Sequence, residues 1–306
     1  AVSFMNRQLR NTFLLFLTAF IWGTAFVAQS VGNELVGPFT FTAARSILGA
    51  LALFVLAALF DRLLPSKTAV GTFTERWCDK KLWRTGFGCG FFLVSGTLLQ
   101  QYGLLWTTVG KAGFITSLYI IIVPIAGFFL GRRPTRLTLI AVPVALTGLF
   151  FLCFKAASWR LDFGDILIFL GAFAFSGHIL FIDRYAGNLN AVRMSCIQFL
   201  FCFVVSGLAA LAFEGIDAEA LREAAFPIFY AGVLSSAVAY TLQIIGQRGV
   251  NPTVASLVMS LESVISVLAG WVLLNQALTG REVFGCVLMA VAIVLAQLPD
   301  RFGRFR

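Results

Sequence analysis

The chain has 306 residues, 59% of them hydrophobic and 12% charged, with a mean hydropathy of +0.90 and a net charge of +9. A soluble globular domain carries about 25% charged residues, so this composition excludes that class. A chain this apolar is expected to lie in a lipid bilayer. Its positive charge is therefore interpreted as that of a membrane protein.

Apolar runs of a length that crosses a bilayer recur along the whole chain. A helix needs about 20 residues, at 1.5 Å each, to cross roughly 30 Å of hydrocarbon. The runs are continuous rather than alternating, which favours helices over the strands of a barrel. Ten segments are predicted: about 11–31, 38–60, 83–106, 111–130, 136–154, 163–182, 192–213, 225–246, 252–274 and 281–298.

The basic residues lie in alternate connections between these segments. With the N-terminus inside, 17 Lys and Arg residues fall on the cytoplasmic side and five on the other. Because basic loops stay in the cytoplasm, both termini are predicted to be cytoplasmic. The net charge therefore orients the protein in its membrane, and no nucleic-acid partner is expected.

One stretch of the sequence occurs twice. Leu99–Leu130 matches Leu242–Leu273 at ten of 32 positions when shifted by 143 residues, and the matches include Gln100 with Gln243. An offset near half the chain length indicates an internal duplication, so two repeats are predicted, over 1–155 and 156–306. With five crossings in each copy, the second repeat is inverted in the membrane relative to the first. Inverted repeats are typical of secondary transporters that bind their substrate near the midplane.

Several motifs resemble those of one transporter family. Trp22–Phe26, Pro38–Arg45, Gly110–Thr116 and Gly131–Thr135 together resemble the drug/metabolite transporter superfamily, specifically its EamA-type ten-helix bacterial members. The resemblance implies an all-α membrane protein of ten helices in two inverted five-helix repeats, in the bacterial inner membrane. It also implies export of amino acids or other small metabolites by alternating access.

Ionisable side chains inside a bilayer are costly, which makes each one a candidate for the site. Glu262 is predicted near mid-membrane, where it binds a substrate amine, carries a proton or is a structural acid. Arg45 either anchors a substrate carboxylate or phosphate, or reaches outward or pairs with Glu262 or Glu34. His178, the only histidine, either contacts the cavity or is hydrogen-bonded packing.

The other candidates are polar or aromatic side chains at mid-helix positions. An unpaired amide is unfavourable in lipid, so the glutamines are expected to face the interior. The aromatic residues are expected to line an apolar wall or to be ordinary packing. The candidates are Gln100, Gln101, Gln243, Tyr119, Tyr240, Trp22 and Phe175.

The leading hypothesis is a secondary transporter of amino acids or related metabolites, with a small-molecule substrate and the lipid bilayer as its partners. An antiporter of nucleotide sugars or sugar phosphates is the alternative, although few cations are available for phosphate. An intramembrane enzyme or a non-transporting membrane protein is less well supported, since no nucleophile–base pair is evident. The six cysteines occur singly, so no metal or cofactor is expected, and monomer and homodimer both stay open.

Overall fold

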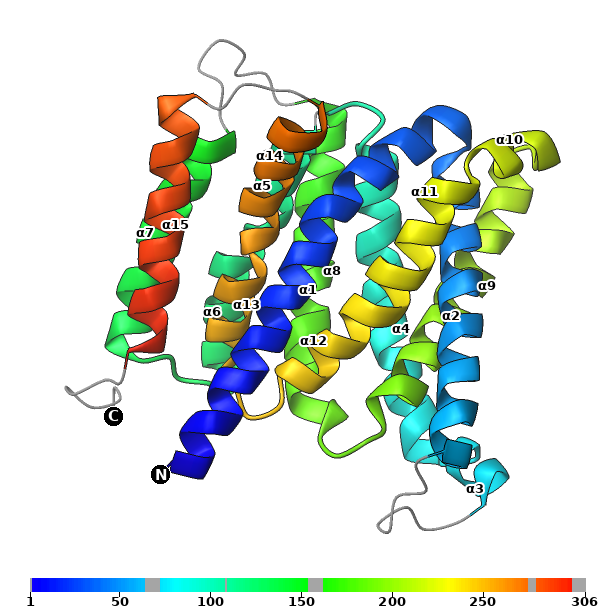
Figure 1. Ribbon diagram of the computed structural model, residues 1–306, viewed down its shortest axis with the longest axis horizontal. Helices are drawn as coiled ribbons and strands as arrows, with labels where there is room; N and C mark the ends of the chain where they lie inside the picture. The colour runs from blue at the N-terminus through cyan, green and yellow to red at the C-terminus, as the bar shows by residue number, and fades with distance from the viewer. Residues whose placement is uncertain (1, 64–71, 108, 154–161, 275–278, 299–306) are drawn as a thin grey trace.

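In the computed structural model, residues 2–63, 72–107, 109–153, 162–274 and 279–298 are described, and all regular elements among them are helical. The first half contains α1 (Val2–Leu35), α2 (Pro38–Leu63), α3 (Phe73–Trp77), α4 (Lys80–Gly103), α5 (Val109–Thr116), α6 (Tyr119–Phe129) and α7 (Arg136–Cys153). The second half contains α8 (Phe163–Phe181), η1 (Ile182–Ala186), α9 (Ala191–Phe213), α10 (Ala218–Glu223), α11 (Ala225–Phe229), η2 (Tyr230–Ala239), α12 (Tyr240–Gly246), α13 (Pro252–Met259), α14 (Leu261–Leu274) and α15 (Gly280–Gln297). Figure 1 shows these helices standing side by side, with α7 and α15 paired at one edge.

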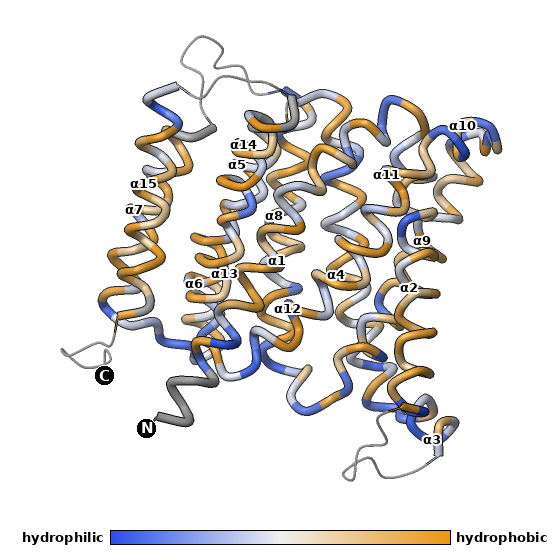
Figure 2. Tube along the Cα trace, in the orientation of Figure 1, coloured by the Kyte–Doolittle hydropathy of each residue, from blue (hydrophilic) through white to orange (hydrophobic). Residues whose placement is uncertain are grey.

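The prediction of an all-α membrane protein is confirmed. Among the described residues, seven helical spans are long and apolar enough to cross a bilayer, and Arg136–Phe151 is a shorter apolar helix. Helices overlap all ten predicted segments, while a full set of ten membrane crossings stays a prediction. Hydrophobic residues follow the helices and polar residues gather towards their ends (Figure 2).

The helices of the two halves pack in matching pairs. In the second half, α8 is the counterpart of α1, and η2 with α12 is the counterpart of α4. Helix α4 packs on α8, and in the equivalent contact η2 and α12 pack on α1. Similarly, α1 packs on α14 while α8 packs on α6, and α2 packs on its own counterpart α9. This is the pattern expected when two similar units face each other across an approximate two-fold axis. The predicted boundary at 155/156 lies outside the described residues.

The duplicated stretch is interrupted at the same place in each copy. In the first half α5 ends at Thr116 and α6 begins at Tyr119, and in the second α13 ends at Met259 and α14 begins at Leu261. Each break places a first-turn residue of the second half-helix, Tyr119 or Glu262, at the middle of the bundle. Discontinuous helices of this kind are how transporters present side chains to a central site.

Glycine allows α1 and α14 to approach closely. A Cβ atom built on Gly23 would lie 2.6 Å from the backbone oxygen of Glu262 and 2.6 Å from the Cβ of Ile265. Real Cβ atoms do not come this close to other atoms, so only glycine fits at this crossing. Small residues at helix interfaces generally serve this purpose in membranes.

The antiparallel helices α2 and α9 are joined by side chains at both ends. At one end Glu214, which follows α9, accepts hydrogen bonds from the backbone N–H groups of Phe39 (2.9 Å) and Thr40 (2.7 Å). The first N–H groups of a helix have no partner within it, so Glu214 satisfies two of them for α2 and its charge suits the helix dipole.

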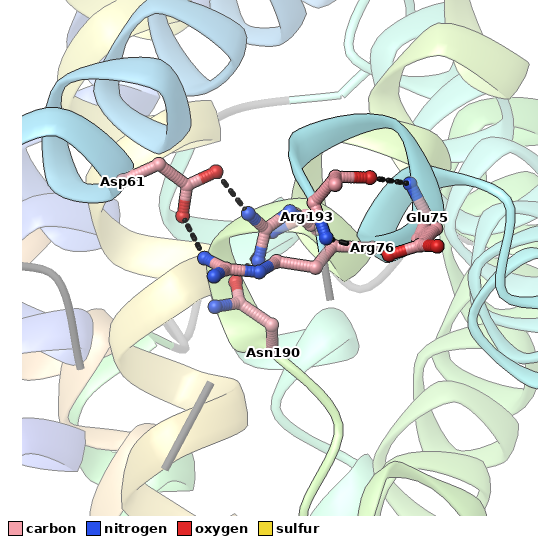
Figure 3. A network of polar contacts seen from close by, with 6 residues as sticks. Asp61, Glu75, Arg76, Asn190 and Arg193 are labelled. Atoms are coloured by element: carbon pink, nitrogen blue, oxygen red, sulfur yellow. Dashed lines mark hydrogen bonds and ion pairs between the residues drawn. The ribbon is translucent and has the colours of Figure 1, made fainter. Parts of the chain in front are cut away.

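At the opposite end Asp61 of α2 holds two arginines. It pairs with Arg193, in the first turn of α9, at 2.5 Å and with Arg76 of α3 at 2.8 Å (Figure 3). Beside them Glu75 accepts from the Thr72 backbone at 2.6 Å, and the bonds from Thr72 hold the pKa of this exposed carboxyl below its usual value. The α2–α9 pair is therefore fixed at the two faces of the membrane rather than at one.

Candidate functional site

A small cavity, of about 40 Å³, lies between the two halves of the molecule. It is lined by side chains from α1, α2, α4, α5, α6 and α8 and from η2, α12, α13 and α14. Nine of the ten candidate residues line it: Trp22, Arg45, Gln100, Tyr119, Phe175, His178, Tyr240, Gln243 and Glu262. The structure therefore brings together side chains that are up to 240 positions apart in the sequence.

Glu262 and Tyr119 are hydrogen-bonded to each other at the cavity wall. The Tyr119 hydroxyl donates to Oε1 of Glu262 at 3.0 Å, and the side chains are almost completely buried. These residues are 143 positions apart, so they occupy the same place in the two copies of the duplicated stretch. The second carboxylate oxygen has no partner in the described part of the chain and is not sealed from the cavity. One carboxylate oxygen of Glu262 is therefore held by Tyr119, and the other can accept a hydrogen bond from a molecule in the cavity.

Arg45 is buried without a carboxylate. Arg45 is 4% exposed, and its guanidinium lies 6.0 Å from the centre of the Phe41 ring. None of the described acids forms an ion pair with it. Neither the expected pairing with Glu262 nor that with Glu34 is present among the described contacts. Its Nε atom is buried with no hydrogen-bond partner, whereas the two terminal nitrogens are not sealed. A buried, unpaired cation of this kind is costly and calls for an anion.

Aromatic rings form one side of the cavity around Tyr240. The Tyr240 ring centre lies 4.6 Å from that of Trp22 and 5.8 Å from that of His178, which meets it edge-on. The Trp22 indole N–H donates to the backbone oxygen of Ser235 at 3.4 Å. Rings at these separations attract each other, so the wall is apolar and well held.

His178 is oriented by a neighbour that the sequence did not single out. Its Nε2 atom lies 3.1 Å from Oε1 of Gln198 on α9, and both side chains are buried. Because an amide oxygen can only accept, this assignment places the proton on Nε2 and leaves Nδ1 as an acceptor. The Nδ1 atom makes no described hydrogen bond and is not sealed from the cavity.

The glutamines take different roles. Gln100 donates to the Thr116 hydroxyl at 2.9 Å within the cavity wall, whereas Gln243 makes no side-chain hydrogen bond among the described residues. Gln101 lies away from the cavity and donates to the backbone oxygen of Gln29 at 3.2 Å and to Asn33 at 2.7 Å. Gln101 thus joins α4 to α1 in the structure.

Two residues of α1 that line the cavity are not among the candidates predicted from the sequence. Phe26 and Gln29 follow Trp22 at four and seven positions, which puts all three on one face of the helix, and all three line the cavity. That spacing is the signal that could have found them. Gln29 also keeps a buried amide oxygen without a partner.

The lining brings charged, polar and aromatic groups together. It combines one carboxylate, one guanidinium and several amide and hydroxyl groups with a wall of aromatic rings. In the part of the chain that the structure describes, there is no cluster of three His, Cys, Asp or Glu residues that could hold a metal ion. These groups offer partners for both charges and for an apolar group of a small molecule, although in this conformation the cavity has room only for molecules the size of water.

Comparison with known proteins finds relatives along most of the chain. The model of the EamA-like transporter family matches twice, over residues 10–154 and 162–298. An uncharacterized transporter of Archaeoglobus fulgidus is 27% identical over 93% of this chain and 84% of its own length. The uncharacterized transporter YwfM of Bacillus subtilis is 26% identical over 97% of this chain and 96% of its own. A solved crystal structure shares the fold, with a TM-score of 0.78 at 19% identity over 95% of this chain and 97% of that one.

Proposed function

This chain belongs to the EamA-like transporter family of membrane proteins, and from that premise we propose that it is a secondary transporter exporting amino acids or closely related metabolites. It works by alternating access, in which the two repeats exchange conformations around one central site. The relatives named as transporters support the transport class, and the lining of the cavity supports the choice of substrate.

The observation that carries the proposal is that Arg45 and Glu262 line one cavity without being paired to each other or to another described charge. Each is at most 4% exposed, so water does not compensate their charges well. An amino acid zwitterion supplies what both lack, since its carboxylate suits Arg45 and its ammonium suits Glu262. A charge-assisted hydrogen bond contributes about 1.5–3 kcal/mol, so two of them favour a zwitterion over a singly charged solute.

The aromatic wall supports a substrate with an apolar side chain. Trp22, Phe175 and Tyr240 stand beside the charged groups in the same cavity. Burying an apolar side chain of the size of Leu or Phe stabilises the complex by about 1.5–3 kcal/mol. A hydrophobic amino acid is therefore favoured over a small polar one.

The position of Glu262 also suits alternating access. Tyr119 and Glu262 are equivalent residues in contact with each other, so they lie close to the approximate two-fold axis that relates the repeats. A group near this axis is equally distant from both faces of the membrane. Glu262 can then stay with the substrate while access changes from one face to the other.

We place the protein in the bacterial inner membrane with both termini in the cytoplasm. The excess of Lys and Arg in alternate connections supports this orientation. The start of α1 and the end of α15 lie at the same face of the molecule, which agrees with it (Figure 1).

Purified protein in liposomes loaded with radiolabelled amino acids tests the proposal. Efflux of a hydrophobic amino acid is expected from these liposomes and not from liposomes carrying Glu262→Gln. Absence of flux for every small metabolite would exclude a transporter of this kind.

The same assay addresses the antiporter alternative. Arg45 is the one permanent cation lining the cavity among the described residues, which is few for a nucleotide sugar or sugar phosphate. Exchange of a phosphorylated sugar without any flux of amino acids would reverse the order of the two hypotheses.

A further inference from the structure

A second, larger hollow opens on the outside of the helix bundle between α6 and α7. It has a volume of about 650 Å³, which lies within the roughly 300–1,000 Å³ of most small-molecule sites. It exists because the two helices pack mainly on others: α6 on α8 and α13, and α7 on α15. We call this hollow the α6–α7 trough.

Proline shapes both walls of the trough. Pro124 lies inside α6 and Pro143 inside α7, and both line the trough. A proline inside a helix removes one hydrogen bond and pushes its ring against the preceding turn, which bends the helix. A proline in each wall therefore favours a separation between the two helices.

The trough is hydrocarbon along its length and ends at a cation. Ile125, Phe128, Phe129 and Leu139 line it and are 42–83% exposed, so its apolar surface is uncovered by protein. Among the described residues that line it, the charged one is Arg133, an exposed side chain in the turn between the two helices. This surface, apolar along the helices and basic at one end, is complementary to a lipid with an anionic headgroup.

The turn is built to hold arginines at this end. Gly131 adopts a positive φ of 78°, and the backbone N–H of Arg132 returns to the Gly127 oxygen at 2.8 Å, which ends α6 in a tight turn. Residues 130–139 contain three arginines and no acid. Arg132 is paired with Asp183 at 2.6 Å, so this turn is also tied to the second repeat.

We propose that the α6–α7 trough binds an anionic phospholipid, with its headgroup phosphate at Arg133 and its acyl chains along α6 and α7. Basic residues at the end of a groove between membrane helices are a recurrent way of holding such headgroups. Asp183, the partner of Arg132, follows α8, whose residues Phe175, His178 and Ile179 line the central cavity. The lipid site and the substrate site are separate, so each can be lost without the other.

Native mass spectrometry of purified protein with added phosphatidylglycerol or phosphatidylcholine tests this proposal. Wild-type protein is expected to retain phosphatidylglycerol in preference to phosphatidylcholine, and Arg133→Gln to reduce that retention about tenfold. The matched control is Arg62→Gln, an exposed arginine at the end of α2, which is expected to behave as wild type.

A second variant tests the apolar part of the site independently of charge. Ile125→Trp fills the trough and is expected to lower retention of phosphatidylglycerol while Arg133 is intact. Equal retention by wild type, Arg133→Gln and Arg62→Gln would overturn the proposal, as would equal retention of the two lipids by wild type. Because lipid retention is measured without transport, failure here leaves the proposed transport function unaffected.

Discussion

Tyr119 and Glu262 hold the same position in the two repeats and are joined to each other by a 3.0 Å hydrogen bond. Only residues close to the approximate two-fold axis can contact their own counterparts. The bond therefore lies close to this axis. It also makes the site asymmetric, because one copy contributes a phenol and the other a carboxylate.

Loss of the Glu262 charge is expected to abolish transport. Glu262→Gln keeps the shape of the side chain and leaves the substrate ammonium without a counter-charge, which predicts a loss of at least about 100-fold in flux. Tyr119→Phe removes only the hydroxyl that positions the carboxylate, so we expect about a tenfold loss. Efflux from liposomes measures both, and because the residues act as a pair their effects should not add in the double variant. Wild-type flux in Glu262→Gln would contradict the assigned role.

Substitution of Arg45 is expected to remove recognition of the substrate carboxylate selectively. Arg45→Gln should weaken binding of an amino acid by about tenfold or more, while the corresponding amine, which lacks the carboxylate, should bind as before. Isothermal titration of the two ligands measures this difference. Arg62→Gln is the matched control for loss of an arginine from α2. If both ligands weaken equally, Arg45 serves structure rather than recognition.

Packing at Gly23 is expected to control the position of Glu262. Gly23→Ala introduces a methyl group 2.6 Å from the Glu262 backbone oxygen, and such overpacking typically costs about 1–3 kcal/mol. Both thermal stability and substrate affinity should fall, although no charged group has changed. In Gly207→Ala the new methyl group meets only the Phe203 ring at 3.8 Å, so this control should leave both unchanged. Unchanged affinity in Gly23→Ala would separate this crossing from the site.

Glu214 is expected to stabilise the start of α2. Glu214→Gln weakens the bonds to the N–H groups of Phe39 and Thr40, with an expected loss of about 1–2 kcal/mol in unfolding free energy. Amide hydrogen exchange at Phe39 and Thr40 should accelerate accordingly. Glu223→Gln removes an exposed acid from α10, close in sequence, and should have no effect. Equal behaviour of the two variants would show that the cap contributes nothing.

Asp61 is expected to stabilise the other end of the α2–α9 pair. Asp61→Asn leaves Arg193, with its side chain 6% exposed, as a buried cation without its partner. Breaking fully buried pairs costs about 3–5 kcal/mol, and this more accessible one should cost about 2 kcal/mol. Arg76→Gln removes the more exposed partner and should cost less, whereas the double variant Asp61→Asn with Arg193→Met should recover part of the loss. Denaturation in detergent measures all three, and a neutral Asp61→Asn would rule out a stabilising network.

Much of the fold could be predicted because its signals are local or repeated. Continuous apolar runs gave the helices, and the 143-residue offset gave the relation between the repeats. The contact between Tyr119 and Glu262 could not be predicted, because equivalence in sequence does not say which equivalent residues meet. That depends on where the axis passes through the packed bundle.

The cavity lining could be predicted only in part, because it depends on the direction in which each side chain points from its helix. Gln100 and Gln101 are adjacent, but successive residues of a helix point about 100° apart, so only Gln100 lines the cavity. The duplication carries a signal for this choice, because Gln100 matches Gln243, which also lines the cavity, whereas Gln101 falls opposite Ile244. The π-helix η2 is unpredicted, since its first-repeat counterpart, α4, is a regular helix at the corresponding place.

The bond between Tyr119 and Glu262 also bears on why the two halves share one polypeptide. In a dimer of identical halves, the two-fold axis would force the same residue onto both sides. An acid at this position would then face a second acid, and two carboxylates at hydrogen-bonding distance cannot both stay ionised. Fusion of the copies frees the two positions to diverge, so that a single carboxylate can lie at the place where the two repeats meet.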